Sequence, residues 1–499
     1  MTTIPADRLR TLLGDLRGER PPLYAGLAAR LRLLVGDGRL PVGTRLPAER
    51  DLAAALHLSR ATVAAAYGRL REQGWADARQ GSGTWTRLPA SHRDSPAAWL
   101  PAPVDPGVVD LAHAAPSAPP QVPAAFAAAL DELPRLLPGH GYQPRGLPEL
   151  RALVAERYTR RGLPTTAEQV LVTSGALHAV GIAVEALTRR GDRVLVEHPT
   201  YPNALDAVRA GGRRPVPAAV DPADPGATVR ALTRAATTAR PALAYVMPDF
   251  QNPTGLLLDD PHRRRLAVGL RQAGTVALVD ETLADLALDT TPGDAVDAVD
   301  AVPGVAPAPF AAVAADLGAG AGEAHVVTVG SLSKSVWGGL RIGWLRADAA
   351  VVPRLARVLG QSQLSGPVLE QLAACHLLER EREVLAVRRA ELRRRRDVLL
   401  AALAEQLPDW EVPRPAGGLV LWCRLPGRSS TALVGAAAER GVLLAPGPRF
   451  GTGAAFDDRL RLPFTQPEAV LGPAAATLAL AAADVPHRPA GDPEQAIVV

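Results

Sequence analysis

The hydrophobic positions along the chain follow different periods in its first part and in its larger remainder. From Leu23 to Val35 apolar residues recur at helical spacing, which predicts an amphipathic helix. Beyond residue 108, helical stretches alternate with short apolar runs, and such runs predict strands buried on both faces. The larger part is therefore predicted to be an α/β domain with a mostly parallel sheet. The runs lie at 170–172, 194–196, 243–246, 276–279 and 326–329.

A chain of 499 residues is too long to fold around one ordinary hydrophobic core, so several folding units are expected. A proline-rich stretch marks the boundary between two of them. Residues 88–108 contain five prolines and little periodicity, which is typical of a semi-rigid linker. We therefore predict a first domain over 1–87, a linker over 88–108 and an α/β domain over 109–484. Residues 350–484 are helix-rich, and 485–499 form a loose tail.

The first domain carries the pattern of three helices followed by a hairpin. Its second helix is predicted to open at Pro47, with acidic residues in the first turn. After a tight connection at 58–60, Ser59 can cap a third helix that runs from Arg60 to Leu70. Residues 80–85, which include two glycines, suit a hairpin tip. Together these elements predict an α+β winged helix-turn-helix, whose third helix enters a DNA groove.

Charge is distributed unevenly along the chain. The net charge is +4, and the excess of arginine over acidic residues lies mainly within residues 1–87, whereas the remainder is close to neutral. A small basic module attached to a nearly neutral body predicts a polyanion as its partner.

Nothing in the sequence indicates a membrane or an oxidising compartment. The first residues lack an apolar signal core, and no stretch of about twenty apolar residues is free of charge. Two cysteines, Cys375 and Cys423, are too few for a disulfide framework or a metal cluster. We therefore expect a cytoplasmic protein with no metal site and no membrane partner.

Three motifs in the first domain resemble the winged helix-turn-helix of GntR-type transcription regulators. They are LPAERDLA at 46–53, LSRATV at 58–63 and GSGT at 81–84. The resemblance implies binding to double-stranded DNA, since arginine at a helix start contacts phosphates or guanine edges and a glycine-rich tip approaches the backbone closely. The alternative is that these residues form only a solvated face. The resemblance places against DNA Arg50, Ser59, Arg60, Thr62, Gln80, Gly81 and Ser82.

One residue stands out in composition, because among 55 basic residues only Lys334 is a lysine. An arginine stays protonated, whereas a lysine amine can lose its proton and condense with a carbonyl. The simplest alternative is a lysine that survived an arginine-biased composition. The neighbourhood of Lys334 favours amine chemistry.

The residues around Lys334 suit a phosphate-bearing aldehyde. Ser331 and Ser333 precede the lysine at the end of a predicted strand, and Arg341 follows among glycines. Open α/β sheets bind ligands at such strand ends. Hydroxyls and a guanidinium can hold a phosphate while the amine reaches an aldehyde, a combination required by pyridoxal 5′-phosphate (PLP). Asp280 ends another strand and can pair with the pyridine nitrogen.

Four motifs in the second domain resemble the fold type I aminotransferases of classes I and II. They are PDFQNPTG at 248–255, Asp280-Glu281, SLSK at 331–334 and RLPF at 461–464, and the resemblance covers roughly residues 110–484. It implies a PLP-dependent transferase fold with large and small subdomains. Carried over by position, it implies catalytic roles for Lys334, which forms the Schiff base (internal aldimine) with PLP, and for Asp280, which pairs with the pyridine nitrogen.

The same resemblance implies further contacts. Asn252 hydrogen-bonds the 3′-oxygen of the cofactor, and Tyr201 stacks on its ring. Arg461 binds the carboxylate of a substrate or effector as a bidentate fork. Tyr142 reaches the phosphate bound in the other subunit of a homodimer. The remaining phosphate contacts implied are Ser174, Gly175, Ala176 and Leu177 at a helix start, with Ser331, Ser333 and Arg341.

Several of these residues also have ordinary structural explanations. An Asn-Pro-Thr-Gly is a common turn, an aspartate that ends a strand is often a helix cap, Tyr201 could be plain packing, and Arg461 could pair with an internal acid. One departure from the family pattern affects chemistry. Many members carry a tyrosine three residues after the aspartate, where this chain has Leu283. Loss of that donor is expected to weaken catalytic tuning more than cofactor binding.

A GntR-type domain joined through a proline-rich linker to an aminotransferase-like domain resembles MocR-type (GabR-like) regulators. This resemblance implies a PLP-dependent transcription factor that forms a head-to-tail homodimer. An amino-acid-like effector would react at the Lys334 internal aldimine and so alter DNA binding. Two alternatives remain open. One is an active aminotransferase with an appended DNA-binding domain, and the other is a regulator whose aminotransferase-like domain is only a dimerisation scaffold.

Overall fold

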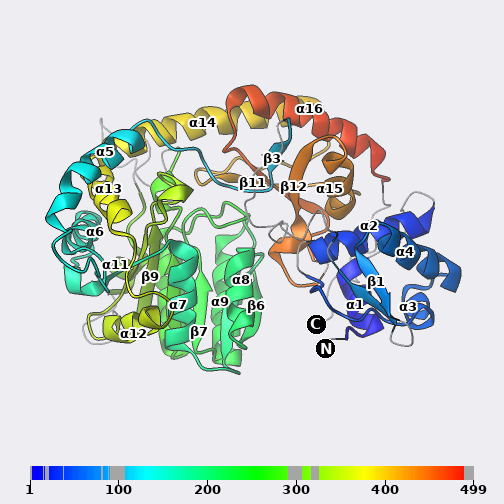
Figure 1. The fold of residues 1–499 in the computed structure, drawn as a ribbon, viewed down its shortest axis with the longest axis horizontal. Helices are drawn as coiled ribbons and strands as arrows, with labels where there is room; N and C mark the ends of the chain where they lie inside the picture. The colour runs from blue at the N-terminus through cyan, green and yellow to red at the C-terminus, as the bar shows by residue number, and fades with distance from the viewer. Residues whose placement is uncertain are drawn as a thin grey trace. The chain divides into compact units, whose positions relative to one another are not determined.

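The structure is a computed structural model, and it divides into two compact units. The first comprises Met1–His113, Val398–Pro413 and Trp422–Val499, and the second comprises Ala114–Asp397 and Arg414–Leu421. The fold is drawn in Figure 1. The residues described are 3–14, 16, 22–36, 39–79, 83–87, 89, 107–289, 306–315, 325–453 and 455–487.

The N-terminal part of the first unit is a winged helix-turn-helix, as predicted. Ser59 caps the third predicted helix, since its hydroxyl accepts a hydrogen bond from the Thr62 N–H at 3.0 Å. The second predicted helix begins at Glu49, two residues later than expected, because Ala48 takes the extended N-cap conformation. The Pro47 carbonyl instead accepts the Tyr67 hydroxyl at 3.0 Å. The helices are α1 (Ala6–Leu13), α2 (Leu23–Gly36), α3 (Glu49–Leu56) and α4 (Arg60–Glu72).

A hairpin follows these helices. Strands β1 (Ala76–Arg79) and β2 (Gly83–Thr86) pair antiparallel, with Arg79 opposite Gly83. The predicted tip residues Gln80, Gly81 and Ser82 lie outside the described residues. The core of this module is made by apolar side chains of α2, α3 and α4 that are almost fully buried, namely Leu27, Leu31, Leu52, Val63 and Tyr67.

The first unit also carries most of a four-stranded sheet, ordered β11-β13-β12-β3. Its short strand β3 (Val109–Leu111), which follows the predicted linker directly, pairs parallel with β12 (Val442–Pro446). Strand β13 (Arg459–Pro463) is the apolar alternation near the end of the α/β domain, and it pairs antiparallel with β12. The remaining elements are β11 (Val420–Arg424), α15 (Ser430–Ala438) and α16 (Glu468–Asp484).

The second unit is built on a seven-stranded sheet of order β4-β10-β9-β8-β7-β5-β6. All five predicted strands are present. Strand β10 runs antiparallel to both of its neighbours, and the pairs from β9 to β6 are parallel. The strands are β4 (Val170–Thr173), β5 (Arg193–His198), β6 (Arg214–Ala219), β7 (Leu243–Val246), β8 (Val276–Asp280), β9 (Val326–Ser331) and β10 (Gly343–Arg346).

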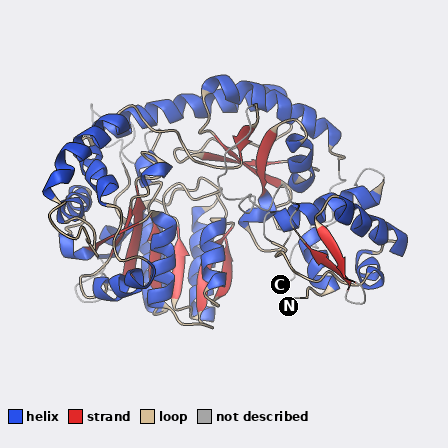
Figure 2. Cartoon of the chain, viewed as in Figure 1, coloured by secondary structure: helices blue, strands red, loops and turns tan. Residues whose placement is uncertain are grey.

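Helices cover both faces of this sheet (Figure 2). Successive strand residues point to opposite faces, so Val194 and Val196 join one apolar cluster and Leu195 joins another. Helices α7 (Ala176–Leu187), α8 (Pro202–Ala210) and α12 (Val352–Ser362) contribute to the cluster that contains Val194. The other face is covered by α5 (Val122–Glu132), α6 (Pro148–Arg160), α9 (Pro225–Ala239), α10 (Asp260–Gln272), α11 (Phe310–Ala315) and α13 (Val368–Glu379).

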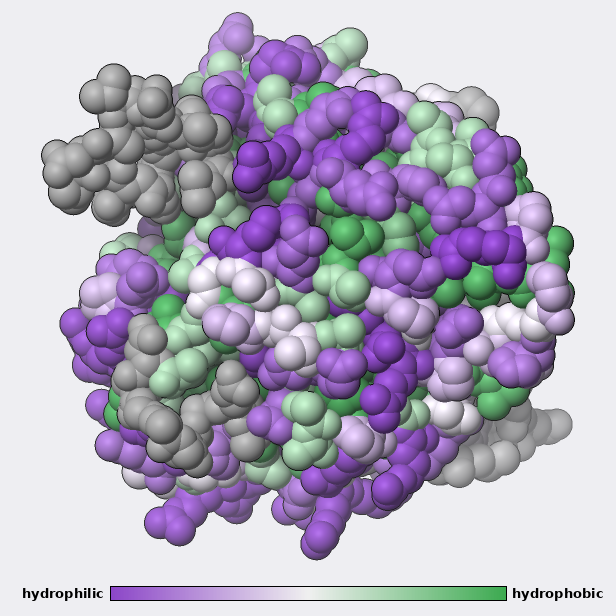
Figure 3. Space-filling model, turned by 90° about the vertical axis from the view of Figure 1, so that its left-hand side faces the viewer, coloured by the Kyte–Doolittle hydropathy of each residue, from purple (hydrophilic) through white to green (hydrophobic). Residues whose placement is uncertain are grey.

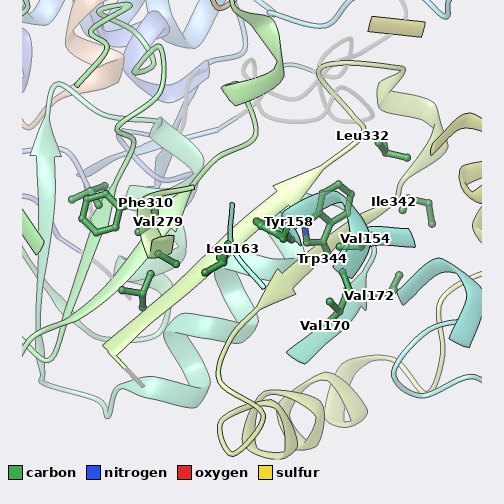
Figure 4. Close-up of a cluster of buried hydrophobic side chains, with 14 of the residues drawn as sticks. Val154, Tyr158, Leu163, Val170, Val172, Val279, Phe310, Leu332, Ile342 and Trp344 are labelled. Carbon is green, nitrogen blue, oxygen red and sulfur yellow. Dashed lines mark hydrogen bonds between the residues drawn. The ribbon is translucent and has the colours of Figure 1, made fainter. Parts of the chain in front are cut away.

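Part of the apolar cluster that contains Leu195 is shown in Figure 4. It packs Val154 and Tyr158 of α6 against Trp344 of β10, whose indole N–H donates to the Tyr158 hydroxyl at 3.1 Å. Satisfying both polar atoms inside the core keeps these large rings in one arrangement. The long helix α14 (Glu381–Gln406) completes the fold.

The visible face in Figure 3 is mainly hydrophilic, with apolar residues in separated patches. No helix in the described part of the chain is long and apolar enough to cross a membrane. The α+β winged helix-turn-helix and the α/β transferase fold of type I predicted from the sequence are both confirmed.

Candidate functional site

The carboxyl ends of the parallel strands bring the predicted chemistry to one edge of the seven-stranded sheet. Strand β8 ends at Asp280, which is the Cα partner of Val329 in β9. Strand β9 ends two residues later at Ser331, and Lys334 lies in the turn that follows. The lone lysine and the aspartate therefore lie at the ends of neighbouring strands.

The antiparallel strand β10 brings a further turn to this edge. Gly343 in β10 is the Cα partner of both Ser331 in β9 and Thr173 in β4. A Cβ atom at Gly343 would lie 2.6 Å from the Gly175 carbonyl carbon. Only glycine lets the turn after β4 pack this closely, and that packing sets Gly175 beside the end of β9.

The turn after β4 forms a positively charged cradle. Gly175 adopts φ 89° and starts α7, and a Cβ there would lie 3.1 Å from the Arg341 guanidinium. Arg341 donates to the Ser174 carbonyl at 2.7 Å. Burial, and then the charge of Arg341, lower the pKa of His178 in the first turn of α7. A helix start beside a guanidinium suits a phosphate.

The two serines before the lysine form a hydroxyl pair. The Ser331 hydroxyl donates to the Ile342 carbonyl at 2.9 Å and lies 2.9 Å from the Ser333 hydroxyl. It also accepts the Ser333 N–H at 3.1 Å. The Lys334 ammonium donates to the Ala114 carbonyl at 2.8 Å. Hydrogen bonds of its own hydroxyl groups thus hold the turn, whereas the Lys334 amine is hydrogen-bonded to a carbonyl oxygen outside the turn.

Asp280 is held by donors that the sequence did not reveal. It is 6% exposed, and its Oδ2 accepts the Tyr245 hydroxyl at 2.6 Å. Its Oδ1 accepts the Thr282 N–H at 3.0 Å and the Thr282 hydroxyl at 2.6 Å. Burial, followed by the charge of Asp280, raises the pKa of Tyr245, so this phenol stays neutral and donates. Leu283, at the position of the family's tyrosine, is buried.

Asn252 and Tyr201 lie on loops that follow β7 and β5. The Oδ1 atom of Asn252 is buried and has no hydrogen-bond partner among the described residues. The Tyr201 hydroxyl accepts the Asn203 amide at 3.0 Å. A buried amide that is not fully hydrogen-bonded is costly unless a ligand engages it. Together with the amine, the carboxylate and the cradle, this amide makes a donor set that fits PLP.

A buried pair behind the site connects these two loops. Glu197 at the end of β5 accepts the Met247 N–H and the Gln251 amide, both at 3.1 Å. The same amide donates to the Pro199 carbonyl at 2.8 Å, and its oxygen accepts the Thr254 N–H at 3.0 Å. Gln251 is fully buried. Because the nitrogen and the oxygen of its amide are both hydrogen-bonded, Gln251 fixes the Tyr201 loop relative to the Asn252 loop.

This pair predicts a pH dependence of stability. Burial raises the pKa of Glu197 from 4.5 to about 8, against hydrogen bonds from Met247 and Gln251 that lower it. Between these two pH values the native state therefore binds more protons than the unfolded state. Protonated Glu197 thus contributes stability that is complete below about pH 4.5 and is lost as the pH rises through about 8. Urea unfolding should show wild type losing about 3 kcal/mol more than Glu197→Gln between pH 5 and pH 8.

The exposed Glu156, which pairs with Arg160 at 2.9 Å, provides the matched control. Glu156→Gln should follow the wild-type profile. Parallel profiles for wild type and Glu197→Gln would show that Glu197 is ionised throughout.

Two predicted site residues, Tyr142 and Arg461, are not part of the cluster formed around Asp280 and Lys334. Tyr142 is 54% exposed. Arg461 lies on β13 in the first unit, where it donates to the Ala112 carbonyl and lies 4.8 Å from the Phe450 ring centroid.

The predicted DNA face is in the winged helix-turn-helix. The side chains of Arg50 and Arg60 are 83% and 76% exposed, at the first turns of α3 and α4. Arg60 donates to Glu49 at 3.3 Å, and the Ser59 hydroxyl lies 2.8 Å from that of Thr62. The start of α4 therefore presents a guanidinium and two hydroxyls.

Sequence reasoning missed Tyr245, Thr282, Glu197 and Gln251. A signal was present for two of them, because a tyrosine inside the apolar strand β7 and a glutamate directly after the run 194–196 interrupt patterns of buried residues. Their hydrogen-bond partners come from other strands, so no local pattern assigns them.

Two family models match the chain. The model for aminotransferase class I and II matches residues 108–478, and that for bacterial regulatory proteins of the gntR family matches residues 23–85. The chain belongs to the class I and II aminotransferase family. The added gntR region gives it the MocR-type architecture predicted from the sequence.

The chain is similar both to proteins named as regulators and to aminotransferases of known structure. An uncharacterized HTH-type transcriptional regulator of Bacillus subtilis, YisV, is 26% identical over 80% of this chain and 84% of its own. A probable rhizopine catabolism regulatory protein of Rhizobium meliloti, MocR, is 26% identical over 78% of each chain. The crystal structure of an α-aminoadipate aminotransferase from Thermus thermophilus, LysN, matches with TM-score 0.65 and 28% identity, over 76% of this chain and 92% of that one. It is complexed with N-(5′-phosphopyridoxyl)-L-leucine.

Proposed function

We propose that this chain is a PLP-dependent transcriptional regulator whose DNA binding responds to an amino-acid-like effector. The observation that carries the proposal is the presence, in one chain, of a complete PLP-type donor set around Lys334 and of a gntR-family helix that exposes Arg60. Two of the similar proteins are named as regulators and align with 80% and 78% of this chain.

The residues of the second unit suit PLP, on which the fold implies dependence. Bound there, PLP supplies an aldehyde that condenses with amines. Lys334 would hold that aldehyde, Asp280 would keep the pyridine nitrogen protonated, and the Gly175 turn with Arg341 would bind the phosphate. An effector amine would compete with the Lys334 amine for the same carbon. Binding shifts DNA affinity only if the effector binds the two protein arrangements unequally.

We further propose a head-to-tail homodimer with the domains at 1–87, 109–484 and a linker at 88–108. Leu137, Tyr142 and Leu364 are large apolar residues that are 68%, 54% and 64% exposed. The loops that carry them are joined by the Gln143 N–H, which donates to the Ser365 hydroxyl at 2.9 Å. Exposed apolar residues on adjoining loops suit a subunit interface, and Tyr142 would then reach the other subunit's phosphate site.

The proposal is tested by titrating the PLP-loaded protein with a panel of amino acids. The absorption spectrum should change with an effector, and the same concentration range should change the affinity for DNA from upstream of its own gene. A protein without a PLP absorption band would instead be a dimerisation scaffold.

Aminotransferase activity is the second candidate, since the chain resembles the T. thermophilus aminotransferase in fold and sequence. Leu283 removes a phenol donor beside the cofactor, so we expect at most a single half-reaction with amino acids and no steady turnover with a keto acid. Leu283→Tyr should raise the half-reaction rate, by roughly tenfold if the new hydroxyl regains one strong hydrogen bond in the transition state. Steady turnover by wild type, measured as keto-acid formation, would favour an enzyme.

A further inference from the structure

Resting on the proposed function, we propose that Arg388 is a positioning residue for Lys334, because it holds the turn that carries the lysine. Its hydrogen bonds go to backbone carbonyls and to the carboxylate of Glu391. Arg388 lies in the part of α14 that belongs to the second unit, and so does the turn at 332–336. Arginine and turn are therefore parts of one compact unit.

The turn at 332–336 is fixed where it begins. Ser331 ends strand β9, which pairs with β10. The Leu332 N–H donates to the Ile342 carbonyl at 3.1 Å, and the Leu332 carbonyl accepts the Val336 N–H at 2.8 Å. These bonds hold the backbone that precedes the lysine and close the turn around it.

The two carbonyls that directly follow the lysine receive their donors from α14. Ser335 is 1% exposed and Val336 is 3% exposed, and a buried backbone carbonyl is costly unless it accepts a hydrogen bond. Arg388 donates from Nε to the Ser335 carbonyl at 3.2 Å and from Nη2 to the Val336 carbonyl at 2.7 Å. The guanidinium therefore fixes the backbone on the far side of Lys334.

The guanidinium of Arg388 is itself held through all three of its nitrogens. Its Nη2 also donates to the Ser117 carbonyl, and its Nη1 donates to Glu391 at 2.5 Å. The side chain is fully buried. Burial lowers the pKa of Arg388, against the charge of Glu391, which raises it. A planar group with donors in fixed directions can serve three carbonyls and a carboxylate at once.

Apolar packing joins this part of α14 to the turn. Val384 lies one helical turn before Arg388, and it belongs to the same buried cluster as Leu332 and Val336 of the turn. Separation of the helix from the turn would expose these side chains to water, which is unfavourable. The guanidinium is therefore kept in place against the backbone that it bonds.

The contacts of Arg388 do not depend on the state of the lysine amine. They use backbone carbonyls, so attachment of the Lys334 amine to the cofactor aldehyde breaks none of them. In that attachment the neutral amine nitrogen bonds to the aldehyde carbon, and its two protons leave with the aldehyde oxygen as water. The reacting atoms must first come within about 3–3.5 Å. Arg388 fixes the backbone from which the lysine side chain reaches that position.

The test separates covalent attachment of PLP from binding of its ring and phosphate. Full-length protein freed of PLP is mixed with PLP, and attachment is followed by absorbance and checked by borohydride fixation. Arg388→Met removes the donors, and it should attach PLP roughly 10- to 100-fold more slowly than wild type, the effect of misplaced reacting groups. The affinity for pyridoxine 5′-phosphate, which has an alcohol in place of the aldehyde, should stay close to the wild-type value.

A conservative variant and a matched control accompany this test. The amide nitrogen of Arg388→Gln takes the place of Nε and can keep the bond to the Ser335 carbonyl, so its rate should lie between those of wild type and Arg388→Met. It also replaces Arg388→Met should that variant not fold. The control is Arg393→Met, since Arg393 lies on the same helix and donates to the Leu288 carbonyl at 2.7 Å, outside the lysine turn. It should attach PLP at the wild-type rate.

The outcomes separate the role of Arg388 from the proposed function. If Arg388→Gln attaches PLP as fast as Arg393→Met does, the positioning role is wrong. It is also wrong if the attachment rate and the affinity for pyridoxine 5′-phosphate fall by the same factor, since Arg388 then only supports the fold. Either result leaves the regulator in place when wild type attaches PLP and its DNA binding responds to an effector. A wild-type protein in which borohydride fixes no PLP overturns the proposed function and this role with it.

Discussion

Lys334→Ala is expected to abolish covalent attachment of PLP and, with it, the whole effector response of DNA binding. Lys334 is the only lysine in the chain, so no neighbouring amine can replace it. DNA affinity without effector should stay within about twofold of wild type, because the lysine lies in the second unit and the DNA-binding helices lie in the first. The measurements are borohydride fixation of PLP to the protein and DNA binding with and without effector.

Lys334→Arg separates the amine from the charge. Arginine keeps a donor for the Ala114 carbonyl, which Lys334 contacts at 2.8 Å, but it cannot condense with an aldehyde. Both variants should therefore fail to respond. An effector response in Lys334→Arg would mean that charge and hydrogen bonding suffice, and that covalent chemistry plays no part in sensing.

The sequence predicted most of the scaffold because its signals are local. Short apolar runs located five of the seven strands of the larger sheet, and Ser59 marked the start of α4 through its own hydrogen bond to Thr62. Strand β6 was not predicted, and neither was β10. Its four residues, Gly343 to Arg346, are too few for a period, and their place between β4 and β9 depends on pairing with strands far away in the sequence.

The candidate site also contains residues that local sequence signals could locate and residues that they could not. Asp280 and Lys334 could be located because each ends or follows a strand, and parallel strand ends meet at one edge. Tyr245 could not, because its role depends on a 2.6 Å bond to a carboxylate on the adjacent strand. The same limit applies to the backbone partners of Arg461 and Lys334. Neither the Ala112 nor the Ala114 carbonyl has a side chain that marks it as a partner for a cation.

The hydrogen bond from Tyr245 to Asp280 also affects what is expected from a leucine at position 283. Asp280 already accepts three hydrogen bonds, from Tyr245 and twice from Thr282. These bonds fix the position of the carboxylate, so Asp280 stays in place although Leu283 offers no hydroxyl near it. The absence of that hydroxyl is therefore expected to affect catalytic tuning more than the holding of PLP.

Arg60→Ala is expected to weaken binding to the protein's own promoter DNA by about 1–3 kcal/mol, or roughly 5- to 150-fold. Arg60 is the first residue of α4, its side chain is 76% exposed, and its bond to Glu49 at 3.3 Å directs the guanidinium without burying it. The fold should tolerate the change, because an exposed ion pair of this kind contributes under about 1 kcal/mol. Binding isotherms on promoter and unrelated DNA, across a salt series, measure the effect.

The salt series and a matched arginine decide what Arg60 contacts. A phosphate contact lowers affinity equally for both DNAs and reduces the salt slope by about one, whereas a base contact lowers affinity for the promoter alone. Arg230→Ala is the control, since Arg230 has a side chain that is 67% exposed and pairs with Asp224 at 3.2 Å in the second unit. Equal losses in the two variants would trace the effect to net charge, and the start of α4 would then not be the element that reads DNA.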